Sequence, residues 1–146
     1  MKKEELYKIV NSYLKPEGYK KKGSRWNKDV GDFIAVFFLQ RSNYSSQYYI
    51  SIGVLFKQLL PQQKFDYHIS IRSEYIFGDN IIEIFNLENI LSDDIRKEKI
   101  IKAINELIPL LKKFESLQGI EEIIHKYTSA ISITTQARGI LKKNEK

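Results

Sequence analysis

The chain has 146 residues, a net charge of +6 and no cysteine, so it suits one domain and excludes disulfide frameworks, thiolate metal sites and thiol nucleophiles. Residues 1–28 hold nine Lys/Arg and three Asp/Glu, residues 29–94 hold four and nine, and residues 95–146 hold eleven and six. Basic ends around an acidic middle favour contacts within the fold, whereas a nucleic-acid binder more often concentrates positive charge on one surface.

The first predicted element is an amphipathic helix over Lys2–Leu14. Its apolar residues recur at steps of three and four, which places them on one face of a helix. They are Leu6, Ile9, Val10, Tyr13 and Leu14. Pro16 and Gly18 should end this helix.

A strand is predicted to begin at Tyr19, to break or bulge near Gly23 and to resume over residues 24–28. A turn at residues 29–32 leads into the run FIAVFFLQ, residues 33–40. This run is apolar at both alternating sets of positions, so we expect a central strand that is covered on both faces.

Two further strands are predicted from alternation of period two. In residues 47–56 the even positions are large and apolar, which indicates a strand with one buried face. In residues 66–75, Tyr67, Ile69, Ile71 and Tyr75 share one face. The opposite face should carry an exposed polar row made of Asp66, His68, Ser70, Arg72 and Glu74.

Beyond residue 80 the pattern becomes helical. Ser92, with Asp93 and Asp94 after it, predicts the start of a helix whose apolar stripe extends to residue 114. We expect Pro109 to kink or split this helix, and another helix to begin after Gly119. Residues 131–141, ISITTQARGIL, fit either a strand or a helix, and the tail at residues 142–146 should fray.

These elements predict a single α+β domain over residues 1–146. It would contain an antiparallel sheet of about five strands, one N-terminal helix and two or three C-terminal helices packed on the sheet. The first ten residues lack the apolar core of a secretory signal, and no stretch approaches the roughly 20 apolar residues that cross a bilayer. We therefore expect a cytoplasmic protein without a membrane partner.

The common catalytic motifs are missing, including phosphate-binding loops, the dinucleotide fingerprint, metalloprotease helices and the serine nucleophile elbow. His68 and His125 alone have side chains that titrate near neutrality. We expect His125 to lie on the surface. His68 could act as an acid or base oriented by Asp66, with Arg72 holding an anion, but a solvated strand face with charge pairs explains the same pattern. A metal site is not expected.

The segment LKPEGYKKKGSRWNKD, residues 14–29, combines cations with Tyr19 and Trp26. Single-stranded nucleic acid is held by such combinations, provided that the rings are exposed for stacking. If the two rings instead fill the core, the lysines are ordinary charges on an edge strand. We favour the second interpretation and keep nucleic acid as an alternative.

Several short motifs, in this order and spacing, resemble a bacterial family known as domain of unknown function 4304. They are Leu14-Lys15-Pro16, residues 18–23, Trp26, Leu39-Gln40, Ser42, residues 49–53, His68-Ile69 and Arg72. The resemblance covers roughly the first half of the chain. It implies a small α+β protein and supplies no catalytic residue.

We expect a non-catalytic cytoplasmic protein-interaction domain, conceivably an immunity-type protein that neutralises a toxin. The alternatives are a nucleic-acid-binding module that uses residues 19–28, and a small-anion-binding enzyme centred on His68 and Arg72. No cofactor is expected, and the partner would be a protein. The predicted binding residues are Lys21, Arg25, Trp26, Gln40, Tyr49, His68 and Arg72.

Overall fold

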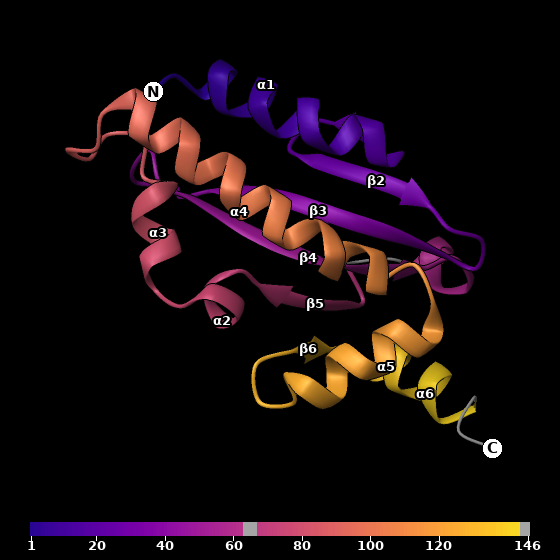
Figure 1. The fold of residues 1–146 in the computed structure, drawn as a ribbon. Helices are drawn as coiled ribbons and strands as arrows, with labels where there is room; N and C mark the ends of the chain where they lie inside the picture. The colour runs from indigo at the N-terminus through magenta and orange to yellow at the C-terminus, as the bar shows by residue number, and fades with distance from the viewer. Residues whose placement is uncertain (63–66, 144–146) are drawn as a thin grey trace.

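The computed structural model describes residues 1–62 and 67–143 (Figure 1). Their strands form one antiparallel sheet in the order β1-β2-β3-β4-β5-β6. Helices α1 and α4 lie across one face of this sheet, and α5 and α6 lie near β6 (Figure 1). The α+β fold predicted from the sequence is therefore confirmed, with six strands in the described ranges in place of about five.

Helix α1, Lys3–Leu14, is the amphipathic helix that the sequence predicts. Its apolar stripe of Leu6, Ile9, Val10 and Leu14 is buried. The chain then forms a short 3-10 turn that contains Pro16 and ends at Gly18, whose φ of +93° lies in the left-handed region. Glycine adopts that conformation without steric cost, so the helix ends where the sequence indicates.

The segment predicted as a strand that breaks or bulges near Gly23 does break there, and the two parts form a hairpin. Strands β1, Lys20–Lys22, and β2, Arg25–Asp29, are antiparallel, and Lys22 pairs with Arg25. Gly23 opens the two-residue loop with a φ of +62°. Glycine at the first loop position is typical of a type II′ hairpin, so the chain reverses at this residue.

Strands β3, Phe33–Arg41, and β4, Tyr48–Phe56, form the centre of the sheet, and β5, Ile69–Arg72, pairs with β4. The side chains that face the helices are buried, among them Trp26, Phe37, Ile50 and Ile52. The prediction that β3 is covered on both faces holds only in part. On the face away from the helices, Val36 is buried while Ile34 and Phe38 remain partly exposed.

Gly53 in β4 allows β5 to pack closely. A Cβ atom at this position would lie 2.0 Å from the carbonyl oxygen of Ile69, which is far inside van der Waals contact. Any side chain at position 53 would therefore push β5 away from β4.

The strand predicted over residues 66–75 is shorter than expected. The ladder ends at Arg72, and α2, Glu74–Phe77, and α3, Asn80–Ile84, follow. The N–H of Ser73 still donates to the carbonyl of Ile50, but the next residues turn away from β4. Tyr75 consequently lies on α2, where it is exposed.

Helix α4, Asp93–Lys113, begins as predicted, because the Ser92 hydroxyl accepts a hydrogen bond from the Ile95 N–H at 3.4 Å. It continues through Pro109, so of the two predicted alternatives, a kink or a split, the split is wrong. Helix α5, Leu117–Lys126, begins two residues before Gly119 and is capped by Ser116. Residues 131–141 contain both predicted alternatives, as β6, Ser132–Ile133, and most of α6, Thr135–Lys143.

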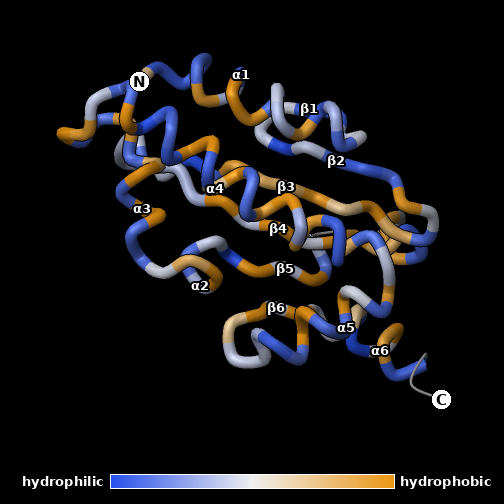
Figure 2. Tube along the Cα trace, viewed as in Figure 1, coloured by the Kyte–Doolittle hydropathy of each residue, from blue (hydrophilic) through white to orange (hydrophobic). Residues whose placement is uncertain are grey.

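One hydrophobic core joins these elements. It extends from Leu6 in α1 through the helix-side face of the sheet to Leu107 in α4, Ile123 in α5 and Ala137 in α6. Figure 2 shows the hydrophobic colouring concentrated along the central strands and on the inner turns of α4. The opposite face of the sheet, called here the far face, carries no long helix (Figure 1).

Candidate functional site: an arginine and aromatic surface on the sheet

Four of the predicted binding residues share the far face of the sheet. In the strand register Arg25 lies opposite Phe38, Phe38 opposite Ser51, and Ser51 opposite Arg72. Gln40 and Tyr49 form the neighbouring pair. Because residues paired across antiparallel strands project to the same side, these side chains form one surface. We call it the arginine face; it consists of Arg25, Phe38, Gln40, Tyr49 and Arg72.

Each arginine of this surface lies over an aromatic ring. The guanidinium carbon of Arg72 is 4.6 Å from the ring centroid of Tyr49, and that of Arg25 is 5.1 Å from the centroid of Phe38. A guanidinium group that lies over a ring is oriented by it, and guanidinium groups bind carboxylates or phosphates. The arrangement therefore holds two oriented cations on one surface.

The two arginines differ in their surroundings. The Arg72 side chain is 46% exposed and its Nε lies 2.5 Å from a carboxylate oxygen of Glu74. Arg25 is partly buried, which lowers its pKa, while the neighbouring Tyr67 acts in the opposite direction. Strand spacing places the two positions roughly 14 Å apart, because two strands lie between them.

The far face is more exposed at this end than along its middle. Val36, Leu55 and Ser70 also project to it and are buried, whereas Gln40 and Arg72 are exposed. Tyr67, which precedes β5, raises the pKa of Arg25 in β2, against the larger effect of burial. Lys20 and Lys22 on β1 are exposed and extend the positive charge toward the edge of the sheet.

Trp26 and Lys21 do not belong to this surface. Trp26 is 0% exposed, its Nε1 donates to Oδ1 of Asn11 at 3.1 Å, and its ring meets Phe37 edge to face. The Lys21 ammonium lies 5.3 Å from the Tyr7 ring centroid on the helix side. Tyr19 is buried as well, so neither aromatic ring of the 19–28 segment is available to stack on a base.

His68 is also placed away from the arginine face. It is 3% exposed, its Nδ1 accepts the N–H of Phe56 at 2.9 Å, and its ring stacks on that of Phe56. Burial lowers the pKa of His68, so the neutral imidazole is favoured. His68 and Arg72 are four residues apart, which separates their backbones by roughly 13 Å in an extended chain.

The prediction that the polar residues of 66–75 form one exposed row is therefore wrong. His68 and Ser70 are buried, and Glu74 lies on α2 beyond the strand. Arg72 alone of these residues projects from β5 into solvent, while Asp66 lies outside the described residues. His125 is exposed, as the sequence predicts.

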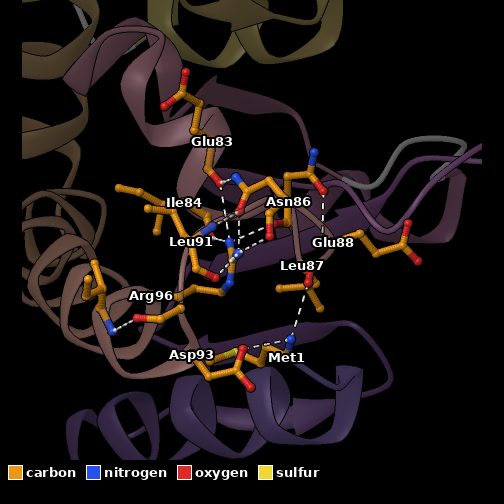
Figure 3. Close-up of polar contacts among 12 residues, drawn as sticks. Met1, Glu83, Ile84, Asn86, Leu87, Glu88, Leu91, Asp93 and Arg96 are labelled. Atoms are coloured by element: carbon orange, nitrogen blue, oxygen red, sulfur yellow. Dashed lines mark hydrogen bonds and ion pairs between the residues drawn. The ribbon is translucent and has the colours of Figure 1, made fainter.

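A buried arginine was missed by the sequence analysis. Arg96 is 0% exposed, and its guanidinium donates to the carbonyls of Ile84 at 2.9 Å, Asn86 at 2.6 Å and Leu91 at 3.2 Å (Figure 3). Arg96 occupies the same helical stripe as Ile100, Ile104 and Leu107. The helical periodicity of this stripe continues one turn before Ile100. It therefore places position 96 on the buried side, which is the signal that could have predicted a buried Arg96.

The parts of the chain that the structure describes contain no group of three or more His, Asp or Glu side chains that could hold a metal ion. Within the same residues, no helix combines the length and the apolar character that spanning a bilayer requires. The arrangement at the arginine face is thus one of cations, aromatic rings and an amide.

The comparisons with known proteins place the chain in a family. The model of the family described as a domain of unknown function, DUF4304, matches residues 10–132, a segment that contains the whole arginine face. No curated protein and no solved structure matches the chain. Because the match covers most of its length, the protein belongs to the DUF4304 family.

Proposed function

We propose that the protein is a non-catalytic interaction domain that binds an acidic surface of a partner protein through its arginine face. The observation that carries this proposal is the pair of arginines, each stacked on an aromatic ring, on one exposed end of the sheet. Arginine and aromatic side chains are the residue types that contribute most to protein interfaces. The nearby Lys20 and Lys22 strengthen attraction to an acidic partner.

The environment of the aromatic rings favours protein over nucleic acid. Binding of single strands depends on rings whose faces are open for bases. The rings of Phe38 and Tyr49 are approached by the protein's own guanidinium groups, and Trp26 is buried. The half-exposed guanidinium group of Arg72 is suited to carboxylates.

The surroundings of the titratable groups support a binding role. A histidine that acts as an acid or base catalyst needs a ring nitrogen within reach of a substrate proton. Nδ1 of His68 is occupied by the Phe56 N–H, and the side chain is buried, so it does not share a surface with Arg72.

Copurification tests the proposal. The wild-type protein, expressed with an affinity tag in its native cell, should recover a stoichiometric protein partner. The double variant Arg25→Gln/Arg72→Gln should lose it, because both stacked cations are removed. The matched control is Lys8→Gln/Lys97→Gln, which removes two exposed positive charges from α1 and α4 and should retain the partner.

The single variant Arg72→Gln separates loss of binding from misfolding. Arg72 is half-exposed, so its replacement should leave the circular dichroism spectrum unchanged. Repeated recovery of no partner by the wild type, or equal recovery by Arg72→Gln and the control, would overturn the proposal. A cytoplasmic location, suggested by the absence of cysteine, belongs to the same proposal. So does an immunity-type role, which predicts that coexpression relieves the toxicity of the captured partner.

Nucleic-acid binding is a second candidate because Lys20, Lys22, Arg25 and Arg72 all project from the far face. Neutralised phosphates release counterions, so affinity for a single-stranded oligonucleotide should fall steeply as salt is added. Fluorescence anisotropy across a salt series measures this. Undetectable or salt-independent binding rejects the candidate.

A further inference from the structure

The loop between α3 and α4, residues 85–92, presents an unusually exposed apolar side chain. Ile90 is fully exposed. The loop around it is nevertheless fixed from within, because Arg96 donates to the carbonyls of Ile84, Asn86 and Leu91 (Figure 3). A branched apolar side chain on a fixed loop loses little conformational entropy when it enters a partner's pocket.

The loop between β3 and β4 forms further hydrogen bonds with residues 85–92. The N–H of Leu87 donates to the carbonyl of Ser46 at 3.2 Å, and the Ser46 hydroxyl donates to the Glu88 carboxylate at 2.8 Å. Phe85 and Leu87 are buried beneath the loop. Ile90 thus projects from a loop whose position is fixed by these hydrogen bonds and buried side chains.

A cavity that suits such a side chain lies between the two helices that this loop joins. It has a volume of about 240 Å³ and lies between α3 and α4, with Phe77 at the end of α2 also lining it. Ile81, Ile84 and Ala103 give it an apolar wall. Lys99, Lys102 and Glu106 also line it, so its cations outnumber its carboxylate two to one. The cavity can therefore accept an aliphatic group that is accompanied by negative charge.

The loop and the start of α4 carry that negative charge. Glu88 and Asp94 are exposed within four positions of Ile90 in the sequence, whereas Lys99 and Lys102 at the cavity are exposed cations. Asp93 is exposed as well, but it pairs with the N-terminal ammonium of Met1 at 3.0 Å. The loop links α3 to α4, the two helices that form most of the cavity. The projecting side chain and the cavity therefore belong to the same helix–loop–helix unit of one molecule.

We propose that a second copy of this chain occupies the cavity, so that Ile90 of each copy inserts between α3 and α4 of the other. The acidic residues beside Ile90 then face Lys99 and Lys102 of the opposite copy. In a two-fold symmetric dimer each Ile90 side chain fills the cavity of the other copy. Both cavities are then occupied, so the assembly closes as a dimer.

Replacement of Ile90 tests this dimer. Sedimentation velocity from micromolar to millimolar concentration should show a monomer–dimer equilibrium for the wild type. Ile90→Asp should weaken dimerisation by roughly thirtyfold or more, the effect of losing a central interface side chain. Tyr44→Asp, at another fully exposed residue on a loop, is the matched control and should dimerise like the wild type.

Charge exchange identifies the contact itself. Lys99→Glu/Lys102→Glu and Glu88→Lys/Asp94→Lys should each be monomeric, because each homodimer would oppose like charges. Their equimolar mixture should form a heterodimer, in which both halves of the interface are complementary. A monomeric wild type at all concentrations, a dimer unaffected by Ile90→Asp, or a mixture that stays monomeric while the wild type dimerises would each overturn the proposal.

Discussion

At the residue scale, Arg96 shows how a single buried cation fixes a loop. Its guanidinium donates to the backbone carbonyls of Ile84, Asn86 and Leu91 in partly buried hydrogen bonds. Lysine keeps the charge but has one ammonium group, so it cannot reach the same spread of carbonyls. Arg96→Lys should therefore lower the free energy of unfolding by about 2–4 kcal/mol. Urea denaturation measures this, and the exposed Arg138→Lys should stay within about 0.5 kcal/mol of the wild type.

His68 makes a residue-scale prediction about pH. Burial lowers its pKa in the folded protein below the ordinary value of 6.5, so the unfolded chain binds a proton first as the pH falls. The stabilisation is complete above about pH 6.5 and is lost as the pH falls toward the lowered pKa. His68→Asn retains an acceptor for the Phe56 N–H but does not titrate.

Thermal unfolding from pH 7.5 to pH 5.5 checks this expectation. The melting temperature should fall less in His68→Asn than in the wild type over this range. His125→Asn, which removes the exposed imidazole, is the control and should retain the wild-type decline. Equal declines in all three proteins would contradict the assigned role of His68.

At the element scale, β3 separates two faces with different energetic roles. Phe37 faces the helices and is fully buried, whereas Phe38 faces away and is only partly covered. Phe37→Ala should cost about 3–5 kcal/mol of unfolding free energy, and Phe38→Ala distinctly less, because truncation of a buried ring leaves a cavity. Chemical denaturation of both variants gives the comparison. Similar losses for the two would mean that the far face is covered more completely than described.

At the scale of the whole molecule, one core connects the N-terminal helix to the C-terminal helices. Trp26 is the single tryptophan and lies in this core between α1 and the sheet. We expect one cooperative transition, so the midpoints from tryptophan fluorescence and far-ultraviolet circular dichroism should coincide. Separate midpoints would indicate that the α1 region unfolds independently of the rest.

The sequence predicted those parts of the fold and site that depend on local periodicity. Steps of three and four residues identify α1 and the body of α4, and alternation identifies β4 and the face shared by residues within one strand. The inward orientation of Trp26 also followed, because its strand offers few other large apolar side chains. These properties depend on neighbours along the chain, and a single sequence contains them.

Tertiary structure alone decided the rest. The registers of β2, β3, β4 and β5 bring Arg25 level with Phe38 and Arg72, and no local pattern specifies these registers. His68 lies on the polar side of its strand yet is buried, because its ring packs against Phe56 at the adjacent strand end. Alternation determines which side of a strand a residue takes, but the segments that pack over that side determine whether water reaches it.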